Sequence, residues 1–348
     1  MLHSSHLRRL PLLLAALFCA LPSPAFDYAG HRMINELALA SLPKDYPAFV
    51  REATAAERIA FLAGEPDRWR NTPDNTFKHW NAPDHFFDIE YLEPLGLQIE
   101  QLPPFRHLFT MQLAEARMKN AAKLPVIDPA RNADHTRELI GYLPWSIAEH
   151  FSKLKSAFSA LKAYEEAGTD TEIANARANV VYYMGVMGHY VGDAAQPLHT
   201  TKHYNGWVGE NPRGYTTSRS FHSWIDGGYL ARVPVDARSV RARLRPARAL
   251  RPADRAIAEP SLFAEALAYI RDQHQLVEPL YRLDQEGKLS PNRPNGHEGR
   301  AFFERQFLTA SQMLGDLWFT AWREAPTDNF LKSALARRKL VEPSRPSS

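Results

Sequence analysis

Residues 188–199 read GHYVGDAAQPLH. They overlap the end of a stretch, residues 176–191, in which small and apolar residues recur every three or four positions. This period predicts a buried helix. His189 and Asp193 are four residues apart, so their side chains project from one face of that helix. Pro197 ends the helix, because proline lacks the backbone N–H that another turn would require. The stretch therefore predicts a helix that presents an imidazole and a carboxylate side by side.

Helical periodicity also dominates the rest of the chain. The same spacing of apolar residues predicts further helices at residues 34–42, 145–161, 262–276 and 302–322. Few stretches alternate with the period of a strand, and no glycine-rich turn of a nucleotide-binding α/β fold occurs in the sequence. The sequence thus predicts a mainly α protein with long loops, the clearest of which are residues 200–219 and 291–299.

The composition is that of an ordinary globular protein, with 45% hydrophobic and 23% charged residues in a chain of 348. It excludes a disordered chain, a coiled coil and a collagen-like repeat. The formal charge of +3 is too small to indicate a nucleic-acid or membrane partner by itself. An arginine-rich stretch at residues 238–255 could attract phosphate or form a solvated linker or helix face. The 14 histidines and single cysteine allow a metal cluster but exclude a cysteine-based zinc finger or a disulfide framework.

Residues 1–25 have the features of a secretory signal peptide. Two arginines precede an apolar run that is too short to span a bilayer comfortably, and small residues precede a cleavage point between Ala25 and Phe26. We therefore expect a secreted or periplasmic protein without a membrane anchor; a retained N-terminal anchor is the alternative. The mature chain is expected to form one domain at residues 26–325, followed by a partly disordered extension at residues 326–348.

Two histidine–aspartate pairs and a third histidine provide imidazole and carboxylate groups, which are the ligands that zinc accepts when cysteine is missing. His222 and Asp226 repeat the spacing of His189 and Asp193. His199 lies between the two pairs. Each histidine taken singly would more often be a surface residue or a hydrogen-bonded core residue. Burying several imidazoles and carboxylates together costs free energy, and bound cations would compensate for that cost.

Further candidate residues lie upstream. Asp67 and Arg70 are three positions apart. His85 and Asp88 have the same spacing. His31 lies five positions after the residue that cleavage would expose as the new N-terminus. These residues extend the set of imidazole and carboxylate groups beyond residues 188–226.

With these residues the chain resembles the zinc-dependent single-strand nucleases of fungi and plants (the S-one/P-one type), which are related to bacterial zinc-dependent phospholipases C. The resemblance extends from Phe26 to about Trp322. It is most specific at residues 188–199, where a histidine is followed by Gly-Asp and then by Gln-Pro-Leu-His. It implies a single helical domain that holds three zinc ions. Phe26 stands where the family usually has tryptophan.

The resemblance also implies three sets of zinc ligands. The first set is Asp67, His85, His189 and Asp193. The second set is His31, the amine and carbonyl of Phe26, and Asp193, which would bridge the first two ions. The third set is His199, His222 and Asp226.

Arg70 and Asp88 match the family's non-ligand arginine and aspartate, which implies catalytic roles. Zinc would lower the pKa of a bound water that attacks phosphorus, and Arg70 would bind the phosphoryl oxygens as charge builds on them. Asp88 would orient that water or hold Arg70 in place. An ordinary surface salt link is the alternative for these two residues.

The resemblance implies hydrolysis of single-stranded DNA or RNA, and of 3′-nucleotides, to leave 5′-phosphates, with no stable protein partner. The alternatives are a phospholipase C-like phosphodiesterase acting on lipid headgroups and a non-catalytic, zinc-stabilised binding protein. The nuclease is favoured because the second pair ends in Asp226, where the phospholipase branch has glutamate. The long insert between His199 and His222 and the position of His31 near the predicted N-terminus favour it as well.

Overall fold

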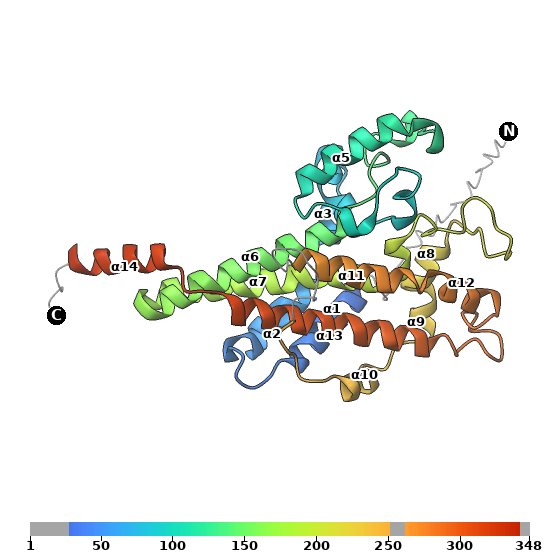
Figure 1. Ribbon diagram of the computed structural model, residues 1–348. Helices are drawn as coiled ribbons and strands as arrows, with labels where there is room; N and C mark the ends of the chain where they lie inside the picture. The colour runs from blue at the N-terminus through green and yellow to red at the C-terminus, as the bar shows by residue number, and fades with distance from the viewer. Residues whose placement is uncertain (1–27, 251–261, 342–348) are drawn as a thin grey trace, which may run out of the picture.

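The computed structural model describes residues 28–250 and 262–341 and consists of helices joined by loops (Figure 1). Its α-helices are α1 (Tyr28–Ser41), α2 (Ala53–Leu62), α3 (Glu65–Arg70), α4 (Asn75–Asn81), α5 (Arg106–Lys119), α6 (Leu143–Ala167), α7 (Asp170–Ala195), α8 (Phe221–Ser223), α9 (Leu230–Arg232), α10 (Ala237–Arg243), α11 (Leu262–His274), α12 (Val277–Gln285), α13 (Arg300–Glu324) and α14 (Asn329–Val341). A π-helical turn spans Trp224–Tyr229, and 3₁₀ turns include Pro197–Thr200. No strand occurs among the described residues, so the prediction of a mainly α protein is confirmed.

The helices predicted from periodicity are present in the structure. Residues 176–191 lie in α7, and the other predicted ranges fall in α1, α6, α11 and α13. The prediction for α11 ran to residue 276, two residues beyond its end at His274. Residues 291–299 contain no helix, as predicted, and the predicted loop at residues 200–219 is free of helix except for Thr200, which ends a 3₁₀ turn.

Helix α7 lies at the centre of the molecule and packs against α1, α2, α6, α11 and α13 (Figure 1). Its N-terminus is fixed by a capping box, in which the Thr169 hydroxyl accepts from the Glu172 N–H and the Glu172 carboxylate accepts from the Thr169 N–H. Its second half is surrounded by other helices, so residues 184–195 are all buried. This position places the motif of residues 188–199 in the interior.

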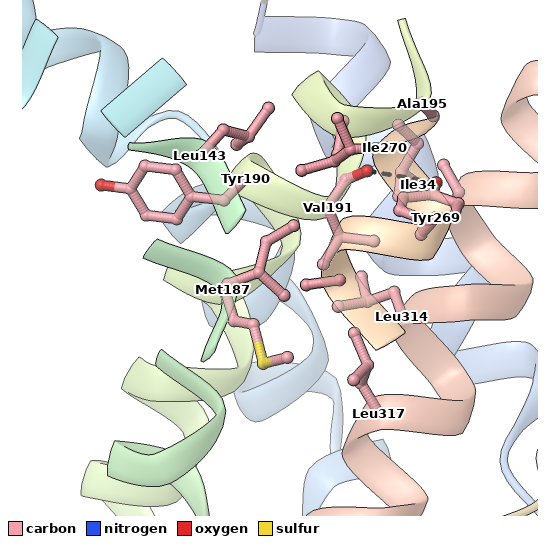
Figure 2. Packing of buried hydrophobic residues seen from close by; sticks show 14 of the residues in the cluster. Ile34, Leu143, Met187, Tyr190, Val191, Ala195, Tyr269, Ile270, Leu314 and Leu317 are labelled. Atoms are coloured by element: carbon pink, nitrogen blue, oxygen red, sulfur yellow. Dashed lines mark hydrogen bonds between the residues drawn. The ribbon is translucent and has the colours of Figure 1, made fainter. Parts of the chain in front are cut away.

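Apolar contacts fix the rotation of α7 about its axis. Val191 packs with Ile34 of α1 and with Leu314 and Leu317 of α13, all of which are completely buried (Figure 2). The Tyr269 hydroxyl of α11 donates to the carbonyl of Val191 at 3.4 Å. Because these residues of α1, α11 and α13 pack against one side of α7, the polar side chains of the motif lie on its other side.

Glycines allow α1 and α2 to approach α7 closely. A Cβ atom at Gly188 would lie 1.7 Å from the Asn35 Oδ1 atom, and one at Gly192 would lie 2.6 Å from the His31 Nδ1 atom. The Asn35 amide donates across the interface to the carbonyls of Ile59 and Gly185 at 2.8 and 3.0 Å. The close approach brings His31 to the same face of α7 as the motif.

Gly188→Ala is expected to lower the free energy of unfolding by about 1–3 kcal/mol, because the new methyl group overlaps Asn35 and pushes α1 away from α7. Urea denaturation measures this change. Asn179→Ala is the matched control, since it adds alanine to the exposed face of the same helix and should be neutral or slightly stabilising. Unchanged stability of Gly188→Ala would show that the helices are not held at this distance.

The arginine-rich stretch is described only as far as residue 250. The two terminal nitrogens of the Arg245 guanidinium contact the two carboxylate oxygens of buried Asp316 in α13, with Nη1 3.0 Å from Oδ1. The backbone N–H of Arg248 donates to the same carboxylate at 2.9 Å. Arg245 therefore anchors this segment to α13. Residues 251–255 lie outside the described residues.

Helix α14 falls within the predicted C-terminal extension and packs against α6. Arg338 of α14 forms an ion pair with Glu172 at 2.6 Å. The last part of the extension, residues 342–348, lies outside the described residues, as does the predicted signal peptide. No helix in the described part of the chain is long and apolar enough to cross a lipid bilayer.

Candidate metal centre

The first histidine–aspartate pair lies on one buried face of α7, as its spacing predicts. The His189 Nε2 atom is 3.2 Å from the Asp193 Oδ2 atom. On the other side of the ring, the His189 Nδ1–H group donates to the carbonyl of Ala63 at 2.7 Å. Because a carbonyl can only accept, Nδ1 carries a proton, and Nε2 is the nitrogen that faces Asp193. A second bond of this kind is typical of histidines that bind metals.

The Asp193 carboxylate is surrounded by four imidazoles. Its Oδ2 atom lies near His189 and 2.9 Å from the His85 Nδ1 atom. Its Oδ1 atom lies 3.3 Å from the His31 Nε2 atom and 3.8 Å from the His199 Nε2 atom. The two oxygens thus face different pairs of histidines, which is the arrangement that a carboxylate bridging two cations requires.

His199, His222 and Asp226 form an adjoining group. The His222 Nε2 atom is 2.7 Å from the Asp226 Oδ2 atom and 3.2 Å from the His199 Nε2 atom. His199 lies in a 3₁₀ turn, and its Nδ1–H group donates to the carbonyl of His85 at 2.6 Å. Its Nε2 lone pair therefore faces His222. The structure brings together all three residues of the predicted third set.

Gln196 has a structural role at this group that the sequence analysis did not assign. It is fully buried, and its Nε2–H group donates to the Asp226 Oδ1 atom at 2.7 Å. Its Oε1 atom accepts from the backbone N–H of Leu198 at 3.0 Å. Gln196 therefore holds one oxygen of Asp226 and leaves the other for His222 or a cation. The Gln-Pro-Leu-His run marked this residue without indicating what it contacts.

Gln196→Met is expected to weaken zinc binding at the His199, His222 and Asp226 group by about 10- to 100-fold, because Asp226 loses the partner that orients it. Competition with a chromogenic chelator measures this affinity. Gln312→Met is the matched control, since the Gln312 side chain accepts from the backbone N–H of Arg245 in another part of the molecule. Equal zinc affinity in the Gln196 variant and the wild type would contradict the positioning role.

Asp67 lies at the edge of the cluster. Its Oδ1 atom is 3.8 Å from the His189 Nε2 atom but only 2.7 Å from the Arg70 Nε atom. Asp67 forms a possible metal-binding group with His31 and His189, whereas His85 groups with His189 and Asp193. The residues of the predicted first set are therefore adjacent, but they divide between two groups that share His189.

Asp88 lies in the same region but not in contact with Arg70. No ion pair joins the two residues in the described structure, because Arg70 contacts Asp67 instead. Burial, and then the nearby charge of Glu90, raise the pKa of the Asp88 carboxyl well above its usual range. Burial therefore favours the uncharged form of Asp88.

The protonation states of the cluster suit a cation. Burial opposes ionisation of Asp193, yet His199 and His189 lower its pKa well below the usual value. Burial opposes ionisation of Asp67 as well, but His189 and Arg70 lower its pKa to about 2. Burial and Arg70 lower the pKa of His85 to about 3. Ionised carboxylates and a neutral imidazole are the forms that bind zinc.

The donor set and spacing fit zinc. The His189 Nε2 and His85 Nδ1 atoms are 2.9 Å apart, similar to the separation between His199 and His222. Nitrogen lone pairs at such distances repel one another unless a proton or a cation lies between them. Tetrahedral Zn–N bonds of about 2.0–2.1 Å place ligand atoms about 3.3 Å apart. Phe26, the remaining predicted ligand, lies outside the described residues.

The cluster opens into a cleft of about 840 Å³. His85, His199, His222 and Asp226 line one part of the cleft, and Arg70 and Asp88 also face it. The predicted catalytic residues therefore share the cleft with the candidate ligands.

Comparison with protein-family models, curated proteins and solved structures found no match to this chain. The arguments about function therefore depend on the three His/Asp groups and on the cleft that His85 and the His199, His222 and Asp226 group line. Buried His/Asp groups that can bind metal ions are established for the described residues, while the identity and number of the ions are matters for experiment.

Proposed function

We propose that this chain is a zinc-dependent phosphodiesterase that hydrolyses single-stranded nucleic acid. One observation carries the proposal: three adjoining His/Asp groups, linked through contacts of His189 and Asp193, reach a cleft that is lined by His85, by the His199, His222 and Asp226 group, and by cationic side chains. A phosphodiester carries a negative charge and gains more during hydrolysis, so closely spaced cations stabilise its transition state. The likeness of residues 188–199 to the single-strand nucleases supports the same activity.

The histidines and aspartates of the cluster are suited to bind cations, whereas other side chains of the cleft are suited to bind the substrate. Asp193 can join two cation sites because its oxygens face different histidines. The neighbouring group of His199, His222 and Asp226 can hold a third cation beside them. Zinc bound at these groups would act as a Lewis acid and lower the pKa of water at neutral pH.

Arg70 is suited to bind the phosphoryl oxygens. Its Nε atom contacts Asp67, which orients the guanidinium group toward the cleft that Arg70 lines. The two terminal nitrogens can then donate to a pair of phosphoryl oxygens. Asp88 lines the same cleft, and its raised pKa favours the protonated carboxyl, which can donate a hydrogen bond to a phosphate.

A phospholipid headgroup is the second candidate substrate, and exposed apolar side chains near the cleft favour it. Leu108, Met111 and Met118 follow one face of α5, and Met118 is 77% exposed. Val126 lines the cleft and is 98% exposed. Exposed apolar side chains of this kind suit contact with a lipid surface.

The deciding experiment is an assay of the purified, zinc-loaded protein on single-stranded DNA, 3′-AMP and phosphatidylcholine vesicles. The proposal expects products with 5′-phosphates from the DNA and no comparable release of phosphocholine. Faster cleavage of phosphatidylcholine would support the lipid substrate. Zinc binding without hydrolysis of any of the three would favour a non-catalytic binding protein.

A further inference from the structure

Lysine and arginine side chains line the cleft beyond the candidate metal groups, and only some of them form ion pairs with carboxylates. Lys78 is 3.0 Å from Asp134, and Arg131 is 3.6 Å from Asp128, so both are neutralised by carboxylates of the same wall. Arg117, Arg137 and Lys202 also line the cleft, and none of the three forms an ion pair with a carboxylate in the described part of the chain. The Arg137 Nε–H group donates instead to the carbonyl of Arg131 at 3.3 Å. Three cationic side chains are therefore left to attract an anion from solution, and Arg117 and Lys202 are the two that act on Tyr91.

Arg117 and Lys202 share the cleft with Tyr91. The Lys202 Nζ atom is 5.9 Å from the centre of the Tyr91 ring, within the range of a cation–π contact. Burial, and then Asp88, raise the pKa of Tyr91, while the charge of Arg117 acts in the opposite direction. Tyr91 consequently stays a phenol that can donate its proton, and it has one cation over its ring and a second that acts on it within the same cleft.

The backbone around Lys202 is fixed by Glu90. The Glu90 carboxylate accepts from the Thr201 hydroxyl and, at 3.1 Å, from the backbone N–H of Lys202. The nearest carboxylate thus binds the loop backbone and leaves the Lys202 ammonium group without an acidic partner.

Helix α5 is held to the segment that contains Tyr91. The Asn120 side chain, at the end of α5, donates to the carbonyl of Leu95 at 3.2 Å. Phe109 and Leu113 on the inner face of α5 are buried in the core. Arg117 and Tyr91 are therefore positioned by the same packing, although α5 lies beside the stack of long helices (Figure 1).

We propose that Arg117, Lys202 and Tyr91 form a second phosphate subsite, which binds a backbone phosphate next to the one that is cleaved. The inference rests on the proposed function and deepens it. A cleft of about 840 Å³ that reaches from His199 to Arg117 has room for more than one phosphoester group. Two cations and a phenol are suitable donors for the oxygens of a phosphodiester. The subsite makes a polynucleotide a better substrate than a mononucleotide.

The test compares two substrates of the zinc-loaded enzyme, a short oligothymidylate and 3′-AMP. Arg117→Gln and Lys202→Gln should each lower kcat/KM on the oligonucleotide about tenfold at low salt and leave kcat/KM on 3′-AMP unchanged. Each should also reduce the slope of log(kcat/KM) against log salt by about one. Arg131→Gln is the matched control, because it removes a cleft cation that Asp128 already neutralises, and it should behave as the wild type.

Two further measurements separate this inference from the proposed function. Zinc content and thermal midpoint should be unchanged in the variants, which excludes a structural cause. Fluorescence anisotropy of a labelled oligothymidylate measures binding whether or not the protein cleaves it. Undiminished oligonucleotide binding by both variants, or equal losses on both substrates, would overturn the subsite. Absence of nucleic-acid cleavage by the wild type would refute only the proposed function.

Discussion

Asp193→Asn should lose zinc from the two groups that this residue joins and should lower hydrolysis of single-stranded DNA by about a thousandfold. The Asp193 oxygens face four imidazoles, so the residue is the carboxylate with the most contacts to candidate ligands in the cluster. An asparagine side chain is neutral, has only one oxygen, and presents an NH₂ group that cannot bind a cation. Two cations would then lie close together without the negative charge that compensates for their repulsion.

Zinc content by elemental analysis and the initial rate on single-stranded DNA measure this effect. Asp316→Asn provides the matched control, because Asp316 is also a buried aspartate with a cationic partner, Arg245, but lies outside the cluster. The control should lose stability while keeping its zinc and its rate per folded molecule. Near-normal zinc content and rate in Asp193→Asn would show that the residue does not bridge two sites.

The parts of the site that could be predicted from the sequence are those that depend on local geometry. A helix places side chains four residues apart on one face, so the pairing of His189 with Asp193 follows from the periodicity of α7 alone. The second pair kept its proximity for a related reason, although Asp226 lies in a π-helical turn. The assembly of the upstream residues was indicated by the resemblance to a nuclease family, because periodicity contains no information about which helices pack together.

Contacts between distant segments escaped prediction for the same reason. Gln196 meets Asp226 only because the chain returns after a loop of about twenty residues. Nothing near Arg117 in the sequence shows that it shares a cleft with Lys202, since that proximity depends on how α5 packs. Gly188 could be recognised as part of the motif, but the reason for a glycine there is the position of Asn35 on another helix.

The predicted roles of Arg70 and Asp88 illustrate how tertiary structure changes an interpretation based on spacing. Their spacings from Asp67 and His85 matched the nuclease pattern, and both residues do line the cleft. Arg70 nevertheless pairs with Asp67, three residues before it on α3, as an ordinary helical salt link would. The burial that raises the pKa of Asp88 depends on neighbours from several segments and cannot be deduced from a single sequence.

Removing zinc with a chelator should abolish hydrolysis and lower the free energy of unfolding, because a cation that binds only the folded state stabilises it by mass action. The effect is about 4 kcal/mol for each site when free zinc is a thousandfold above its dissociation constant. Zinc should restore both activity and stability, whereas Mg²⁺ should not, since imidazole nitrogen is a poor ligand for magnesium. Restoration by Mg²⁺ alone would contradict a histidine-rich zinc centre.

The metal-free protein should also become less stable as the pH falls from 7 to 4. His85 has a pKa of about 3 in the folded protein, against about 6.5 in an unfolded chain, so protons bind the unfolded state first and stability is lost below about pH 6.5. The pKa of Asp67, about 2, adds a smaller loss that begins only below about pH 4. His189 acts in the opposite direction, because Asp193 and Asp67 outweigh its burial and raise its pKa.

Urea denaturation of the metal-free protein at several pH values measures the balance of these groups. His85→Gln should make the free energy of unfolding vary less between pH 6.5 and 4. The reason is that the substitution removes the histidine whose pKa is lowered most strongly, to about 3. His150→Gln is the matched control at a buried histidine outside the cluster: its pKa, lowered to about 4 mainly by burial, contributes a dependence of its own in the same range. Loss of pH dependence in both variants, but loss of zinc only in His85→Gln, is the expected result. Equal stability of the metal-free wild type at pH 4 and pH 7, with the same profile in His85→Gln, would mean that His85 is not buried in its neutral form, and the argument for a preformed cation site would fail with it.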